Sequence, residues 1–475
     1  MTNWRGGVPI ESKRDSNTNG HPAIPVSVPV PLTALHWLVG LLVLISIGRV
    51  HDHVPILAAL RPGLLLTVVC VCLALLRPKV LQPKNLSRSP SGRLIMLLGC
   101  AVILSTVTGI SFGGSASFLL SALLPLSALI FLTHAIIRRT SDLAWLTLCY
   151  LMGVTAVALA SIFFADTLVL DGYTRQGGVG MYDGNDIAVI YAVGIPLCLV
   201  FLRGNHRLPL LLSAAALLLA ILSLALSASR GGFLGLVAVF LSILLLSRGW
   251  GLGRRLLILV VPLLVLSVLA PPGYWDQMAT MLNPTGDYNF TSDGGRIAVW
   301  TRGLGYVAQY PVFGIGPDNF LRAEWSLSPA GQSGLLGIGM QDRAAHNTFL
   351  QVWAEMGTVG LIIWLLLLSF GIVNPLLLRR RMSNTWFKGP DEGLRLLFLL
   401  ASYLPASYVG FAVTSFFVSH AFTAIIYVLS AITAGHYVLT RRALNAHHVT
   451  RATRNPPGSC STSGDFGPPM RSTRA

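Results

Sequence analysis

Three arginines and one histidine stand where their side chains could bind an anion or act on it. Arg175 shortly precedes the sixth apolar segment of the chain, Arg230 begins the eighth and His346 begins the tenth. Arg296 stands at the start of a shorter amphipathic stretch. The N-termini of helices carry free N–H groups and partial positive charge, which attract anions. Because the planar guanidinium of arginine can bind two phosphate oxygens at once, the pattern predicts a site for a doubly charged, phosphate-like group.

Neighbouring polar residues extend this group. Asn185 is placed to cap the first turn of the sixth segment. Glu355 lies one to two turns into the tenth segment, and an acid inside a membrane span is a candidate functional residue by default. Asp186 is a similar candidate that lies nearer to water.

Each of these residues also has a purely structural interpretation. Arg230 could mark the end of a helical hairpin, Arg296 could anchor a helix at the membrane interface, and Arg175 could be an ordinary loop charge. His346 could cap a helix. The glycine pair in Gly231–Gly235 favours helix packing over a functional role.

The composition indicates what kind of protein must position these residues. The chain has 475 residues, of which 53% are hydrophobic and only 11% are charged, and its mean hydropathy is +0.67. Since a soluble domain carries roughly a quarter charged residues, this chain lacks the charge to coat a water-facing surface. We therefore expect an all-α, polytopic membrane protein, and exclude a soluble enzyme, a disordered chain and a fibrous repeat.

The apolar segments predict about 12 transmembrane helices, because many approach the roughly 20 residues that cross a bilayer. They fall in a transmembrane domain over residues 31–440, between a disordered polar tail (1–30) and a disordered basic tail (441–475). One uninterrupted helix over 208–246 would be about 58 Å long, so the chain must turn there, and Gly231-Gly232 is the expected turn. The segments are 32–49, 58–76, 94–111, 116–137, 143–164, 186–202, 208–227, 231–247, 256–270, 347–370, 394–417 and 419–439.

The basic residues orient these helices, because lysine and arginine gather on the cytoplasmic side of a membrane. With the N-terminus in the cytoplasm, 26 of the 34 basic residues are cytoplasmic and both termini lie inside. This asymmetry accounts for the net charge of +16 without a nucleic-acid partner.

The external connection over residues 271–346 is much longer than the other outer loops. Within it, Ile297, Trp300, Leu304 and Val307 recur at helical spacing. We expect the loop to carry short helices, including an amphipathic helix at the outer membrane surface.

Four motifs follow one another between about residues 174 and 360. They are Thr174-Arg175-Gln176-Gly177 with Gly184-Asn185-Asp186-Ile187-Ala188; Leu226-Ser227-Ala228-Ser229-Arg230-Gly231-Gly232; Gly295-Arg296-Ile297-Ala298-Val299-Trp300 with Pro311-Val312-Phe313-Gly314-Ile315-Gly316; and Ala345-His346-Asn347-Thr348-Phe349-Leu350 with Glu355-Met356-Gly357. In this order they resemble the O-antigen ligase and polymerase superfamily of bacterial membrane glycosyltransferases. Gly184 stands where that family usually has proline.

The resemblance implies transfer of a glycan from an undecaprenyl-pyrophosphate carrier at the periplasmic face of the bacterial inner membrane. In the ligase branch the acceptor is lipid A–core, and in the polymerase branch it is a second carrier-linked repeat unit. The resemblance implies no nucleotide sugar, no metal and no other cofactor. We expect the ligase, because a large external loop would help to place two bulky amphiphiles side by side. The oligomeric state is left open.

On this interpretation, Arg230 and Arg296 hold the donor's pyrophosphate and His346 is the general base on the acceptor hydroxyl. The expected substrate-binding residues are Arg175, Asn185, Asp186, Gly231, Trp300, Arg343, Asn347 and Glu355. A twelve-span transporter or lipid flippase is the alternative from another class. The two halves of the chain show no internal repeat, which such transporters usually have.

Overall fold

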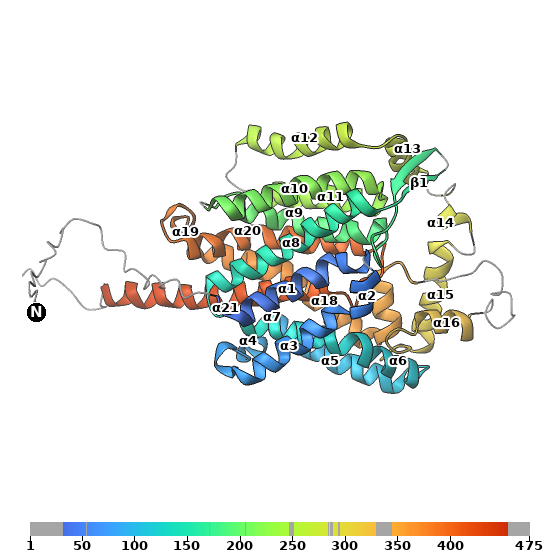
Figure 1. The fold of residues 1–475 in the computed structure, drawn as a ribbon, viewed down its shortest axis with the longest axis horizontal. Helices are drawn as coiled ribbons and strands as arrows, with labels where there is room; N and C mark the ends of the chain where they lie inside the picture. Colours follow the sequence, from blue (N-terminus) through green and yellow to red (C-terminus); the bar gives the residue numbers. More distant parts are fainter. Residues whose placement is uncertain are drawn as a thin grey trace, which may run out of the picture. The chain divides into compact units, whose positions relative to one another are not determined.

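Helices make up most of the regular structure, as the sequence predicts (Figure 1). The computed structural model describes residues 32–328 and 344–454, except 54, 171, 205, 247–250, 284, 286–287 and 293–294. The longer helices are α1 (Ala34–Gly48), α3 (Pro62–Leu76), α5 (Pro90–Thr108), α7 (Leu124–Ile136), α8 (Thr140–Phe164), α9 (Gly184–Phe201), α10 (Arg207–Ser227), α11 (Arg230–Leu246), α12 (Leu252–Leu269), α15 (Arg296–Gln309), α18 (Thr348–Arg381), α20 (Glu392–Ser415) and α21 (Ala424–Arg454). The shorter ones are α2 (Pro55–Leu60), α4 (Lys84–Arg88), α6 (Phe112–Phe118), α13 (Tyr274–Ala279), α14 (Tyr288–Thr291), α16 (Phe320–Ser326) and α19 (Thr385–Lys388), with helical turns η1 (Val50–His53), η2 (Pro78–Val80), η3 (Leu119–Leu123) and η4 (Thr280–Leu282).

Each of the twelve predicted apolar segments coincides with helical structure. In the described part of the chain, nine helices are long and apolar enough to span a membrane. Three shorter apolar helices, Ala34–Gly48, Arg230–Leu246 and Val260–Leu269, correspond to the first, eighth and ninth segments. The protein is therefore a helical, multi-pass membrane protein, and the count of twelve crossings stays a prediction.

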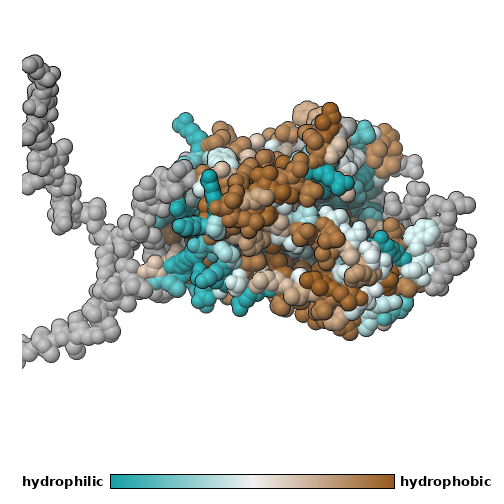
Figure 2. Space-filling model, turned by 60° about the horizontal axis from the view of Figure 1, so that its bottom comes forward, coloured by the Kyte–Doolittle hydropathy of each residue, from teal (hydrophilic) through white to brown (hydrophobic). Residues whose placement is uncertain are grey.

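The surface of residues 32–442, which form one compact unit, matches a lipid environment. Large apolar side chains are exposed along α3, α5, α10 and α12, among them Leu64, Leu97, Leu218 and Leu264. Figure 2 shows a face on which hydrophobic side chains form a broad surface while hydrophilic ones gather toward one end. An apolar surface of this extent is unfavourable in water and favourable against lipid.

Helix α9 is the central helix of the group that carries the candidate site. It packs against α8, α10, α11 and α20 and is buried over most of its length. Small residues permit this close packing: a Cβ on Gly235 of α11 would lie 2.1 Å from Thr414 Cγ2, and one on Gly410 of α20 would lie 2.7 Å from the Ala192 carbonyl oxygen. The tight packing fixes the N-terminal ends of α9 and α11 relative to each other.

The turn between α10 and α11 corrects one expectation. It falls at Ala228 and Ser229 instead of at Gly231-Gly232, which lie inside the first turn of α11. Ala228 has a left-handed backbone (φ 46°), and the Ser229 hydroxyl accepts a hydrogen bond from the Gly232 amide at 3.1 Å. The glycines serve packing, since a Cβ on Gly231 would lie 3.0 Å from the Phe417 ring.

A two-stranded hairpin departs from the expected all-helical fold. Strands β1 (Thr167–Leu170) and β2 (Tyr173–Gln176) pair antiparallel, with Leu168 opposite Arg175. The Asp171-Gly172 dipeptide between the two strands is a typical hairpin signal in the sequence. The hairpin matters for the site because Arg175 lies on β2.

Helix α18 is interrupted where another segment inserts against it. Gly357 has φ 65° and ψ −171°, and the amide of Thr358 donates to the Pro311 carbonyl at 2.9 Å. In return, the Ile315 amide donates to the Ala354 carbonyl at 2.8 Å. The backbone groups released by the break are thus satisfied by residues 311–316, as buried backbone requires.

The chain ends differ from their expected limits in one respect. Helix α21 continues to Arg454, beyond residue 441, where a disordered tail was expected to begin. The expected N-terminal tail, residues 1–30, lies outside the described residues.

Candidate functional site

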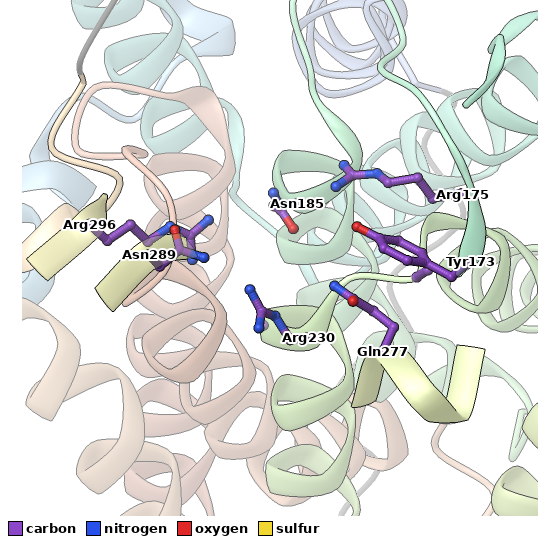
Figure 3. Close-up of a pocket in the computed structure, with 9 residues that line it drawn as sticks. Tyr173, Arg175, Asn185, Arg230, Gln277, Asn289 and Arg296 are labelled. Atoms are coloured by element: carbon purple, nitrogen blue, oxygen red, sulfur yellow. The ribbon is translucent and has the colours of Figure 1, made fainter. Parts of the chain in front are cut away.

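A polar cavity of about 290 Å³ lies where β2, α9, α11, α13, α14 and α15 meet. Figure 3 shows the side chains of Arg175, Arg230 and Arg296 reaching toward it from three separate elements. The described residues that line it are Tyr173, Arg175, Asn185, Ala228, Arg230, Gly231, Gln277, Asn289 and Arg296. Five of these were predicted as site residues from the sequence: Arg175, Asn185, Arg230, Gly231 and Arg296.

Arg175 reaches the cavity from β2. Its Nε atom is buried and has no hydrogen-bond partner among the described residues. A Cβ on Gly184 would lie 2.7 Å from Arg175 Nη2, so glycine at this position leaves room for the guanidinium. This contact gives a physical reason for glycine where the family that the motifs resemble usually has proline.

Arg230 is placed by the first turn of α11. Its Nη1 donates to the Thr280 hydroxyl at 2.9 Å, which connects it to the η4 turn. The preceding residue, Ser229, donates its hydroxyl to Asn185 Oδ1 at 2.8 Å. Asn185 therefore joins the start of α9 to the start of α11, beside the cavity that both helices line.

Arg296 is the first residue of α15, the predicted amphipathic helix. One face of α15 packs against α18 through Val299, Tyr306 and Val307, while Ile297 remains 42% exposed. The burial of this face places the N-terminal end of α15, with Arg296, at the cavity.

The electrostatic character of the cavity is basic. Its described lining includes three arginines and no acidic residue. The N-terminal turns of α11 and α15 add partial positive charge at Arg230 and Arg296. Such an arrangement can bind a phosphate or pyrophosphate group and stabilise negative charge that develops on it.

His346 lies near this cavity but does not belong to its lining. It is half-buried, has a left-handed backbone (φ 44°) and comes just before α18. Trp300 Nε1 donates to the carbonyl of Ala345 at 2.9 Å. Trp300, which was predicted as a binding residue, thus bonds to the backbone next to His346. It lies on α15, the helix that begins at Arg296.

The charges around His346 come from two elements. Burial lowers the pKa of His346, and the positive charge of Arg296 lowers it further, while Asp183 and Asp186 act in the opposite direction. The net shift is downward, so the surroundings of His346 favour its unprotonated form. This is the form that accepts a proton from a substrate hydroxyl.

Asp186 contacts protein groups and does not line the cavity. Its Oδ1 lies 3.1 Å from His420 Nε2, and its Oδ2 accepts from the Asp183 amide at 2.9 Å. Asp183 is the N-cap of α9, accepting from the amide of Asp186 at 2.8 Å. The expectation that Asn185 caps this helix is therefore wrong, because the cap falls two residues earlier.

Asn347 and Thr348 hold the start of α18 in place. Asn347 Oδ1 accepts from the Leu350 amide at 3.0 Å, as an N-cap does. Thr348 Oγ1 accepts from the His420 amide at 2.9 Å and donates to the Val418 carbonyl at 2.7 Å. These bonds give Asn347 a structural role and connect the His346 segment to the His420 loop.

Glu355 is buried (2% exposed) away from the cavity lining. Its Oε1 accepts from the Phe320 amide at 3.3 Å, and its carbonyl accepts from the Gly316 amide at 3.1 Å. The structure thus places this predicted binding residue at the junction between α18 and residues 311–320. Arg343, also predicted to bind substrate, lies outside the described residues.

Four residues at or near the cavity are not predicted as site residues from the sequence. Tyr173, Gln277 and Asn289 line the cavity, and His420 pairs with Asp186. Tyr173 carried a usable signal, since alternate residues of a strand share a face and Arg175 was already a candidate. The other three lie in short helices or a loop. Such segments have no periodic pattern of apolar residues from which the direction of a side chain could be predicted.

The fold and the site define a class, a multi-pass helical membrane protein with a basic cavity that is lined by residues at the starts of α9, α11 and α15. Residues 215–365 match the family described as O-antigen ligase. This segment contains Arg230, Arg296 and His346, and the predicted resemblance to that family is confirmed.

One curated relative is an uncharacterized protein of Haemophilus influenzae. It is 23% identical to this chain over 258 residues, which are 51% of this chain and 63% of the relative. The chain thus matches less than two thirds of the relative's length.

Proposed function

We propose that this protein is a membrane glycosyltransferase that moves a glycan from an undecaprenyl-pyrophosphate carrier to an acceptor at the periplasmic face of the bacterial inner membrane. The observation that carries the proposal is the convergence of Arg175, Arg230 and Arg296 on one cavity. A pyrophosphate carries several negative charges on closely spaced oxygens, and three guanidinium groups match it. The match of residues 215–365 to the O-antigen ligase family supports the same reaction.

In the proposed reaction, a hydroxyl oxygen of the acceptor attacks the anomeric carbon of the donor sugar. The bond from that carbon to the pyrophosphate oxygen breaks, and undecaprenyl pyrophosphate leaves with the electron pair. His346 takes the hydroxyl proton, and the arginines stabilise the negative charge that grows on the leaving group. A single displacement of this kind inverts the anomeric centre and requires no metal or nucleotide sugar.

The proposed orientation follows from the distribution of basic residues. The candidate site lies among residues assigned to the external side, whereas most lysines and arginines fall on the cytoplasmic side together with both termini. A periplasmic site is also where a carrier-linked glycan and lipid A–core would meet. Lipid A–core is the acceptor that we propose.

The test is complementation of a deletion strain, with surface polysaccharide resolved on gels and protein quantified in membranes. We expect Arg230→Ala and His346→Ala each to reduce transfer by about 100-fold or more, the scale seen when a group that stabilises a transition state is removed. Arg322→Ala is the matched control, because Arg322 is exposed on α16 and is not among the cavity-lining residues. Full transfer by the His346→Ala protein would disprove its role as the base.

A further inference from the structure

We propose that Tyr173 and Gln277 form a subsite for the sugar that is joined directly to the donor's pyrophosphate. This inference rests on the proposed function and goes beyond it by naming what selects the donor glycan. It concerns the wall of the cavity formed by β2 and α13 (Figure 3).

The spacing along β2 places Tyr173 beside the anion site. Tyr173 and Arg175 are two residues apart on one strand, so their side chains lie on the same face, about 7 Å apart along the strand. Both line the cavity. If Arg175 contacts the pyrophosphate, Tyr173 faces the group attached to it.

Gln277 is held at the same wall by backbone contacts. The Thr174 amide donates to the Pro272 carbonyl at 3.2 Å, which joins β2 to the chain just before α13. Gly273 has φ 73°, and a Cβ there would lie 2.0 Å from the Gly172 carbonyl oxygen. The hairpin and α13 are thus in direct contact, and Gln277 is fixed relative to Tyr173.

Two other polar side chains of the cavity, Asn185 and Arg230, already have protein partners. The Asn185 side-chain oxygen accepts from Ser229, and Arg230 donates to Thr280. By contrast, the Tyr173 hydroxyl and the Gln277 side-chain amide form no hydrogen bond with any residue that the structure describes. Their donor and acceptor atoms therefore remain available to a ligand.

The chemistry of these two groups selects a sugar over the other parts of the donor. A phenol and a primary amide are uncharged, and each can both donate and accept hydrogen bonds, as sugar hydroxyls do. Contact with the prenyl chain would leave these groups without partners, which is unfavourable. The cavity volume of about 290 Å³ lies near the lower end for small-molecule sites, so the subsite takes one sugar and the rest of the glycan extends outside.

The test compares binding of two kinds of probe to the full-length protein in lipid nanodiscs. One is undecaprenyl pyrophosphate, and the other is a panel of undecaprenyl-pyrophosphate monosaccharides bearing glucose, galactose, N-acetylglucosamine or N-acetylgalactosamine. We expect the wild type to bind at least one monosaccharide probe more tightly than undecaprenyl pyrophosphate. Tyr173→Phe and Gln277→Leu should each reduce that preference about 5-fold, as expected for loss of one hydrogen bond.

The matched controls are Tyr310→Phe and Gln309→Leu, which alter the same residue types outside the cavity lining. They should keep the wild-type preference. Equal binding of all probes by the wild type, or variants that weaken both kinds of probe equally, would overturn the subsite while leaving the anion site intact. Binding of neither kind of probe would instead overturn the proposed function together with the subsite.

Discussion

His346 is the proposed general base, and the charged residues around it influence its pKa. Burial and, after it, Arg296 on α15 lower the pKa of His346, while Asp183 and Asp186 at the start of α9 raise it. Asp186 is in turn paired with the buried His420, whose amide bonds to Thr348 near the start of α18. Asp186 is therefore the carboxylate that we expect to assist His346, as a positioning residue that does not touch substrate.

This role predicts a change in the pH dependence of transfer. Removing the negative charge with Asp186→Asn should lower the pKa of His346 further, because a carboxylate that raised it is lost. A base works when unprotonated, so the rise of activity with pH should move to lower pH. The measurement is the transfer rate of purified protein across a pH series.

The control for this experiment is Asp166→Asn, which removes an exposed carboxylate that does not act on His346. Its pH profile should match that of the wild type. An Asp186→Asn protein that is slower at every pH, with an unmoved profile, would show a merely structural role for Asp186.

Among the elements, the interrupted helix α18 has the clearest consequence for stability. The inserted residues 311–316 connect α15 and α16 to α18, so the insertion positions Arg296 and His346 indirectly. Two of the family-like motifs, the one at 311–316 and the one ending in Gly357, meet at this junction. The contacts of residues 311–316 and Gly357 are structural, and these residues are not among those that line the cavity.

Gly357→Ala should destabilise the protein. The backbone conformation of Gly357 (φ 65°, ψ −171°) is one that essentially only glycine adopts, and a Cβ would lie 2.2 Å from the Val312 carbonyl oxygen. Strain of this kind costs about 1–3 kcal/mol. The measurement is thermal unfolding of purified protein in detergent, followed by tryptophan fluorescence.

Gly305→Ala is its matched control, since Gly305 lies inside α15 and a Cβ there would meet nothing within 4 Å. That change should leave the unfolding temperature equal or slightly higher, because alanine favours a helix over glycine. An equal unfolding temperature for Gly357→Ala and wild type would contradict the assigned strain.

At the scale of the whole molecule, the cavity lies among the short helices of residues 271–346 as well as the long helices. Gln277, Asn289 and Arg296 all come from this segment. A surface segment that contributes to the donor cavity is also suited to position a second amphiphile beside it, which is why we favour the ligase over the polymerase.

The corresponding prediction concerns the acceptor. Purified protein given a carrier-linked glycan should transfer it to lipid A–core faster than to a second carrier-linked repeat unit. Product analysis by gel and mass spectrometry distinguishes the two. Transfer to the carrier-linked unit alone would assign the protein to the polymerase branch, with the proposed roles of the arginines and His346 unchanged. The Arg230→Ala protein serves as the inactive control for both acceptors.

The sequence by itself determined the membrane class, the helical segments and the arginines of the cavity. These rest on local properties: an apolar run long enough for a bilayer, and a basic residue at the N-terminal end of a segment. The match of residues 215–365 to the O-antigen ligase family agrees with the motifs read from the residues. The roles of Arg175, Arg230, Arg296 and His346 in catalysis stay predictions.

Only the tertiary structure decided which polar residues share a site. Glu355 proved to be buried at a helix junction, Asp183 replaced Asn185 as the cap of α9, and Asp186 gained His420 as its partner. Tyr173 and Gln277 joined the cavity from a hairpin and a six-residue helix. The physical reason is that such contacts depend on how separate elements pack against one another. Packing brings together residues that are far apart in the chain, and no periodic pattern in the sequence connects them.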